Sequence, residues 1–166
     1  MEKIELKPAS VFHYFEEICK VPRPSKKEEK IIAYLMKFAE DQGLEAKKDE
    51  AGNILMKKPA TPGKENLKTV ILQSHIDMVC EKNSDSTHDF LNDPIETYID
   101  GEWLKAKGTT LGADNGIGMA AQLAVLAAND IEHGPIECLF TVDEETGLTG
   151  AFALKEGFMD GDILIN

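Results

Sequence analysis

Apolar residues recur along this chain with the spacing of helices in some segments and of strands in others. Spacings of three and four residues predict a first helix that Ser10 caps and that ends before Pro22. The same spacing returns after the sequence SKKE at residues 25–28, which has the pattern of a capping box. It predicts a second helix that ends at Gly43, a residue type common just after helices.

Shorter apolar runs bounded by polar residues predict the strands. Residues 69–74 and 136–142 have the length and composition of buried strands. Asp100-Gly101, between two short apolar stretches, is typical of a hairpin. The other predicted elements are two short strands around the turn at 50–53, an alanine-rich helix ending near Asn129, a helix at 149–156 and a strand at 162–166.

The order of these elements indicates the fold class. Strands and helices alternate, which favours an α/β fold with a mostly parallel central sheet and helices on both faces. The chain has 166 residues, enough for one domain with a sizeable core.

Composition and charge narrow the possible partners. The formal net charge of −12 argues against nucleic acid and anionic membranes, which need a basic surface, and makes a cation the expected partner. The apolar runs are too short for a membrane span, and the first residues lack the pattern of a signal peptide. The three cysteines have no C-x-x-C spacing, so neither a disulfide framework nor a cysteine zinc site is expected. A reducing, cytoplasmic setting follows from these features.

Polar residues follow the predicted buried strands at the same end. His75 and Asp77 come at the end of the first strand, and the carboxylate run 143–145 (DEE) comes directly after the second. Asp114 lies in a glycine-rich loop, residues 112–118, which opens a helix between those strands. Because ligands of open α/β sheets bind at the carboxyl ends of the strands, these groups are expected to meet at one edge.

Each group alone has a simpler interpretation. His75 and Asp77 point to the same side of a strand, as in a metal site where a carboxylate orients the histidine, but also as in an ordinary hydrogen-bonded pair. The loop 112–118 has the composition of a phosphate cradle, but Asp114 would repel phosphate. Its carboxylate, favoured by the helix dipole, can offer oxygens to cations, or it can simply cap the helix.

The carboxylate run is the most informative group. It is either a solvated acidic turn or a site where one carboxylate binds a metal ion and its neighbour acts as a base toward water. A histidine with several carboxylates and no thiolate suits zinc, with manganese or cobalt as alternatives. Two such ions bridged by one aspartate would support metal-assisted hydrolysis of an amide or ester.

Three stretches, LQSHIDMV, DGEWLKAKGTTLGADNGIGMA and DEETGLTGAFAL, resemble the aminoacyl-histidine dipeptidases (peptidase D), which belong to the dizinc exopeptidases. The resemblance runs from VPRPSKKEE to GDILIN, nearly the whole chain. It implies the catalytic domain of a dizinc exopeptidase. The implied reaction is hydrolysis of dipeptides that carry C-terminal histidine.

The resemblance also implies a role for each polar residue of the three stretches. His75 would bind the first metal ion, Asp114 would bridge both, and Glu145 would bind the second. Glu144 would be the general base, and Asp77 would be the carboxylate behind His75. The peptide bond after Asp114 would be cis. No role is implied for Asp143, or for the histidines outside these stretches.

The same resemblance implies parts that this sequence does not contain. They are a further aspartate just after the strand that begins at Asp162, a histidine near the C-terminus of a much longer chain, and an inserted lid domain that often dimerises. Residues 1–166 are therefore expected to be the N-terminal portion of the catalytic domain, inactive alone. Two alternatives stay open: another dizinc hydrolase, such as an aminopeptidase or deacylase, and a non-catalytic metal-binding fragment.

Overall fold

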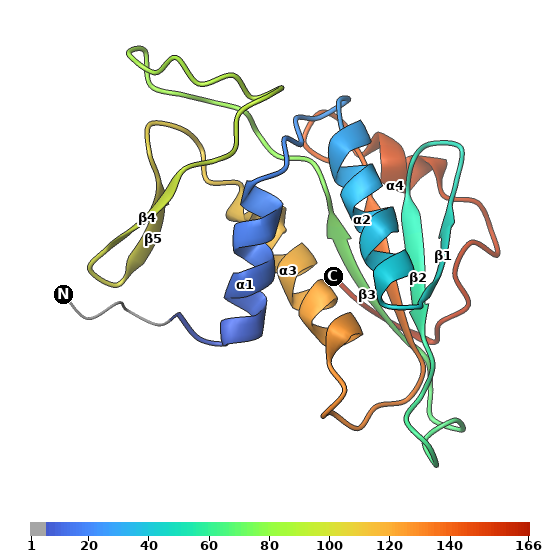
Figure 1. Cartoon of the computed structure of the whole chain (residues 1–166). Helices are drawn as coiled ribbons and strands as arrows, with labels where there is room; N and C mark the ends of the chain where they lie inside the picture. Colours follow the sequence, from blue (N-terminus) through green and yellow to red (C-terminus); the bar gives the residue numbers. More distant parts are fainter. Residues whose placement is uncertain (1–5) are drawn as a thin grey trace.

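The computed structural model describes residues 6–166, which form two sheets and four helices. In chain order the elements are α1 (Ala9–Cys19), α2 (Glu29–Asp41), β1 (Glu45–Lys48), β2 (Ile54–Lys58), β3 (Val70–His75), β4 (Thr97–Asp100), β5 (Trp103–Ala106), α3 (Ala113–Ala127), β6 (Ile136–Thr141), α4 (Thr149–Ala153) and β7 (Ile163–Ile165). Figure 1 shows this arrangement.

The main sheet has the strand order β1-β2-β6-β3-β7. Pairing is parallel through β6, β3 and β7, and antiparallel where the β1–β2 hairpin joins β6. The predicted α/β class is confirmed, with a sheet that is parallel in its centre and mixed overall. In the parallel part, β3 and β6 both end at the same edge, with His75 opposite Thr141.

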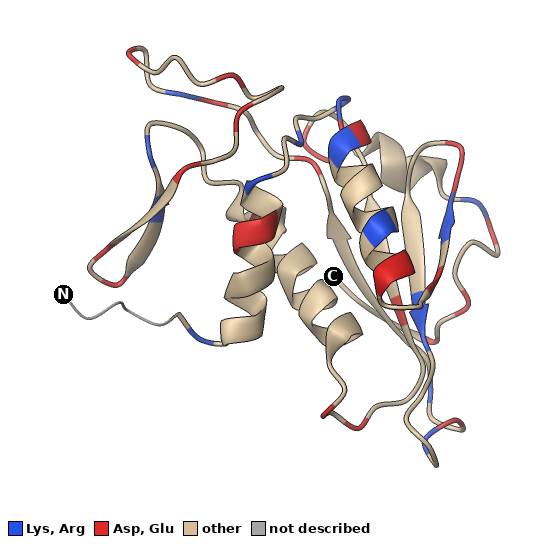
Figure 2. Ribbon diagram, in the orientation of Figure 1, with Lys and Arg blue, Asp and Glu red and all other residues tan. Residues whose placement is uncertain are grey.

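Three helices cover one face of this sheet, and the short helix α4 and the segment after it lie on the other. On one face α1, α2 and α3 pack over alternate residues of β2 and β6, such as Met56 and Phe140 (Figure 1). On the other face, Leu55, Ile71 and Leu139 lie under the segment that follows α4. Figure 2 shows α3 without charged residues beyond its first turn, as expected for a helix buried between α1 and the sheet.

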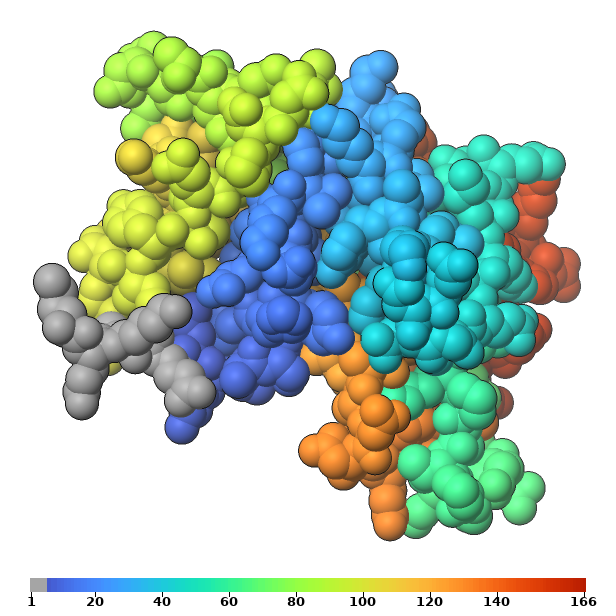
Figure 3. Space-filling model, in the orientation of Figure 1, coloured from blue at the N-terminus to red at the C-terminus, as the bar shows by residue number. Residues whose placement is uncertain are grey.

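The second sheet is the hairpin β4–β5, whose turn at Asp100-Gly101 confirms the predicted hairpin. Together with residues 80–96 it forms a lobe beside α1, seen as the yellow-green atoms of Figure 3. Trp103 on this hairpin is 70% exposed. Among the described residues, no helix combines the length and apolar content needed to cross a membrane.

Three details of the predicted helices are wrong. The first helix is capped by Pro8 in extended conformation, and Ser10 lies inside the helix. The second begins at Glu29 with no side-chain cap, so residues 25–28 do not form a capping box. The helix after β6 ends at Ala153, because the chain turns extended at Leu154 and packs that residue on the sheet.

Candidate metal centre

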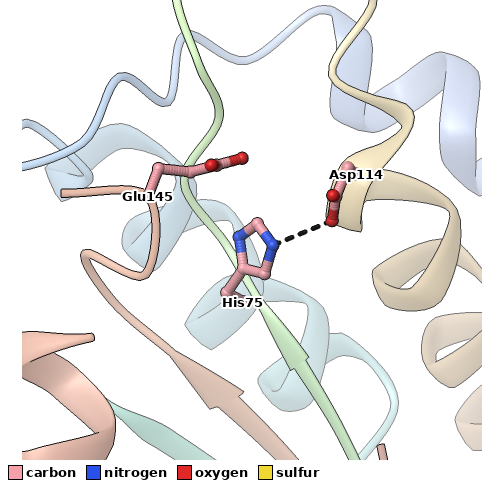
Figure 4. Close-up of side chains that lie close together, drawn as sticks. All are labelled: His75, Asp114 and Glu145. Carbon is pink, nitrogen blue, oxygen red and sulfur yellow. Dashed lines mark hydrogen bonds and ion pairs between the residues drawn. The ribbon is translucent and has the colours of Figure 1, made fainter. Parts of the chain in front are cut away.

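Side chains from three separate elements converge at the carboxyl edge of the sheet. His75 ends β3, Asp114 lies in the first turn of α3, and Glu145 follows β6; one ligand atom from each lies within 4.8 Å of the others. His75 Nε2 is 3.0 Å from Asp114 Oδ1 (Figure 4). The expected meeting of the three polar groups at one edge is therefore confirmed. Asp114 keeps its carboxylate 85% exposed.

Asp77 lies directly behind His75. Its carboxylate Oδ1 is 3.3 Å from His75 Nδ1, and its own carbonyl oxygen is 3.2 Å from the same nitrogen. This arrangement fixes the ring so that Nδ1 faces inward and Nε2 faces Asp114. Because Asp77 is fully buried, the ring orientation is held away from competing water.

The Asp77 carboxylate also holds the carboxylate run in place. It accepts hydrogen bonds from the backbone N–H groups of Glu144 (3.0 Å) and Glu145 (3.2 Å), and from the Ser25 hydroxyl (2.7 Å). Ser25, predicted to cap a helix, instead donates its hydroxyl to Asp77, because a buried carboxylate needs hydrogen-bond donors. One side chain thus connects the end of β3 with the turn after β6.

Glu144 lies at the rim of the cluster. Its Oε2 is 3.9 Å from His75 Nε2, and the side chain is about one-third exposed. Glu144 and His75 line a hollow of about 220 Å³ on the α4 side of the sheet, with Gln73, Thr141 and Leu148. A carboxylate placed this way is free to contact a molecule in the hollow while its backbone is held by Asp77.

Asp143 does not belong to the group formed by His75, Asp114 and Glu145. It is buried, has a φ of +50°, and accepts hydrogen bonds from the hydroxyls of Thr146 and Thr149. Its N–H donates to Glu28 Oε1 (3.0 Å), so the side chain of Glu28, the N-cap residue of α2, bonds to this turn and makes no capping hydrogen bond. Asp143 therefore shapes the turn that directs its two neighbours toward His75. The threonines three and six residues later were a sequence signal for this role.

Asn53 supports the same turn through its side-chain hydrogen bonds. It is fully buried; its side chain accepts from the N–H of Val142 (3.1 Å) and donates to the carbonyl of Gly150 (2.9 Å). Gly150 must be glycine, since a Cβ there would lie 2.3 Å from the carbonyl oxygen of Val142. The sequence placed Asn53 in a turn but did not indicate that it clamps both ends of residues 142–150.

The pKa values follow from burial and from these hydrogen bonds. Burial lowers the pKa of His75, but the bonds to Asp77 and Asp114 outweigh it and the net shift is upward. Burial would raise the pKa of Asp77, but the bonds from His75, Ser25 and two backbone N–H groups bring it well below its usual range. Burial, with the nearby charges of Asp114 and Glu144, raises the pKa of Glu145. A cation bound at this position would offset the repulsion of Glu145 by its neighbouring carboxylates.

The start of α3 differs from the simpler interpretations of its sequence. Gly112, in left-handed conformation, is the N-cap, so Asp114 does not cap the helix. Asp114 and Asn115 have non-helical backbone angles, and the peptide bond between them is cis, as the resemblance implied.

A family model described as "Peptidase family M20/M25/M40" matches residues 71–165, which include His75, Asp114 and the run 143–145. The chain belongs to this peptidase family. It is 53% identical, over 99% of its length, to the cytosol non-specific dipeptidase of Escherichia coli. Its fold superposes on aminoacylhistidine dipeptidase of Vibrio alginolyticus with a TM-score of 0.94 and 59% identity over 96% of the chain.

A more distant neighbour is a tripeptidase of Staphylococcus aureus, with a TM-score of 0.79 and 25% identity over 96% of the chain. The chain spans about a third of the length of two of these relatives, 34% of the E. coli dipeptidase and 32% of the Vibrio enzyme. It spans 43% of the tripeptidase. The resemblance to aminoacyl-histidine dipeptidases seen in the sequence is thus confirmed for this segment.

Proposed function

We propose that residues 1–166 are the N-terminal part of the catalytic domain of a zinc dipeptidase that prefers dipeptides with C-terminal histidine. The observation that carries the proposal is the convergence of His75, Asp114 and Glu145, with Glu144 beside them. The names of the E. coli and Vibrio relatives support a dipeptide substrate, and the latter supports histidine as its second residue.

The donor set fits zinc. One imidazole nitrogen and two carboxylates converge, and the three cysteines are free and absent from the group. In a site with two ions, His75 would hold the first, Asp114 would hold both, and Glu145 would hold the second; manganese and cobalt are compatible with the same donors. Zinc held there would supply a Lewis acid that lowers the pKa of water and polarises the substrate carbonyl.

The other residues supply orientation and proton transfer. Glu144 is placed to take a proton from the attacking water and to return it to the leaving amine, since its carboxylate reaches the space in front of His75 Nε2. Asp77 keeps the Nδ1 proton of His75 engaged, so that Nε2 presents its lone pair to the site. It also fixes the backbone of Glu144, so that the base is oriented before substrate binds.

The setting and assembly of the protein follow the same relatives. We place the enzyme in the cytoplasm, as the name of the E. coli dipeptidase indicates for that protein. A homodimer formed by a lid domain outside this segment is part of the proposal. The net charge of −12 of this segment argues against nucleic acid and anionic membranes as partners.

A comparison of substrates tests the proposed function. The complete enzyme containing this segment is expected to hydrolyse β-alanyl-histidine, to lose activity after dialysis against a chelator, and to regain it with added zinc. Hydrolysis is followed by release of free histidine. Faster cleavage of tripeptides, as the Staphylococcus neighbour suggests, or of N-acyl amino acids, would replace the dipeptidase assignment by the alternative hydrolases.

A further inference from the structure

Arg23 is the only arginine of the chain, which otherwise takes its positive charge from 17 lysines. It follows α1 and is buried, with 2% of its surface exposed. We propose that Arg23 is a positioning residue of the metal centre, which locks the segment after His75 to the segment before Asp114. This inference rests on the proposed function, because it concerns the geometry of the same ligands.

The guanidinium group bridges the two ligand-bearing segments. Its Nη1 donates to the carbonyl oxygens of Ile76 (3.2 Å) and Asp77 (3.0 Å), directly after His75. Its Nη2 donates to the carbonyl of Gly112, two residues before Asp114. The distance between the His75 and Asp114 backbones is therefore set through one rigid, planar group.

The backbone of Arg23 is attached to the same strand end. Its carbonyl oxygen accepts from the N–H of Met78 (3.1 Å), and the next residue, Pro24, forms a β-bridge with Met78. Both ends of Arg23 are thereby fixed relative to β3, and the guanidinium has little freedom to follow a displaced loop.

Two glycines of the loop 112–118 make room for this side chain. A Cβ at Gly112 would lie 2.5 Å from Arg23 Nη2, and a Cβ at Gly116 would lie 2.7 Å from the same atom. The backbone angles of Gly116 require no glycine, so its lack of a side chain is explained by the approach of the guanidinium. The glycine-rich sequence that resembles a phosphate cradle instead accommodates an arginine.

The hydrogen-bond acceptors of Arg23 distinguish a positioning role from an electrostatic one. The three acceptors are carbonyl oxygens, and within residues 6–166 the guanidinium forms no ion pair with a carboxylate. A buried positive charge beside a metal centre repels cations. If Arg23 acted through its charge, removing it would strengthen zinc binding. If it acts through the several N–H donors of its planar guanidinium, removing it weakens zinc binding, and lysine cannot replace it.

Lys58 provides a matched control in the same chain. It is a partly buried cation whose Nζ donates to the carbonyl oxygens of Val125 (2.9 Å), Leu126 (2.9 Å) and Ala128. These carbonyls lie at the C-terminal end of α3, whereas Gly112 and Asp114 lie at its start. Lys58→Met removes a comparable set of hydrogen bonds from the same helix, away from the metal ligands.

The experiment compares Arg23→Lys, Arg23→Met and Lys58→Met with the unchanged protein, each in the complete enzyme that contains this segment. Zinc is titrated into each folded protein by calorimetry, at a temperature where all four are folded by circular dichroism. Both Arg23 variants are expected to bind zinc about tenfold or more weakly, the usual cost of losing a group that orients ligands. Lys58→Met is expected to match the unchanged protein. Zinc affinity retained in Arg23→Lys, or raised in Arg23→Met, would overturn the proposal.

A second measurement needs no metal and keeps the two proposals separable. Amide hydrogen exchange of Gly116, whose N–H donates to the Gly112 carbonyl (3.2 Å), reports on the loop. It is expected to be faster in both Arg23 variants and unchanged in Lys58→Met. Unchanged exchange in the Arg23 variants overturns the positioning role even if zinc binds. Absence of zinc binding by the unchanged complete enzyme, with faster exchange in the variants, contradicts the proposed function alone.

Discussion

Replacing Glu144 by glutamine in the complete enzyme is expected to lower kcat by about 10²–10⁴-fold while both zinc ions stay bound. Glutamine keeps the size of the side chain and the backbone bond from residue 144 to Asp77, but it cannot accept a proton from water. Glu144 is outside the group of three converging ligand atoms, so its loss leaves that group intact.

The neighbouring residue provides the matched comparison. Glu145 has the same backbone support from Asp77, yet its carboxylate belongs to the converging group. Glu145→Gln is expected to lose zinc from one of the two positions together with its activity. Zinc per chain, determined by elemental analysis after dialysis, and kcat at saturating β-alanyl-histidine separate the two variants. Equal loss of zinc in both would refute the division into base and ligand.

The 166-residue chain by itself is expected to turn over no dipeptide and to retain little zinc after dialysis. A catalytic zinc ion takes about three protein ligands besides water. On the proposed assignment, residues 6–166 would offer His75 and Asp114 to the first ion, and Asp114 and Glu145 to the second. Burial raises the pKa of Glu145, and the negative charges of Asp114 and Glu144 raise it further.

Zinc content and β-alanyl-histidine hydrolysis of the purified chain test this expectation. Exposed apolar side chains on α4 and β7, among them Phe152 at 81% and Leu164 at 52%, also favour self-association, which light scattering would detect. Two tightly held zinc ions per chain with measurable turnover would show that the ligand count is wrong.

The sequence predicted where the residues of the site meet better than it predicted which other side chains hold them in place. The alternation of elements placed His75, Asp114 and the run 143–145 at one sheet edge, because the ends of parallel strands meet there. This placement needs only the periodicity of apolar residues and the positions of the strand ends, which are local features of the sequence. The roles of these residues came from resemblance, and spacing alone left simpler interpretations open.

Contacts between distant segments account for most of what was missed. Ser25 and Glu28 have the spacing of a helix cap, but their side chains bond to Asp77 and Asp143 instead. A buried carboxylate or N–H without a hydrogen-bond partner destabilises the fold. The side chains of Ser25 and Glu28 therefore bond to these buried groups and do not cap the helix. Arg23 was missed for the same reason, since its acceptors lie more than fifty residues away.

The most direct test of the metal centre is an anomalous difference map at the zinc edge from crystals of the chain grown with zinc. The described residues contain two groups of three possible ligands: His75, Asp114 and Glu145 at the sheet edge, and Glu28, Asp77 and Asp143 in the interior. A peak is expected within bonding distance of His75 Nε2 and Asp114. A peak in the interior group, or none at His75, would contradict this expectation.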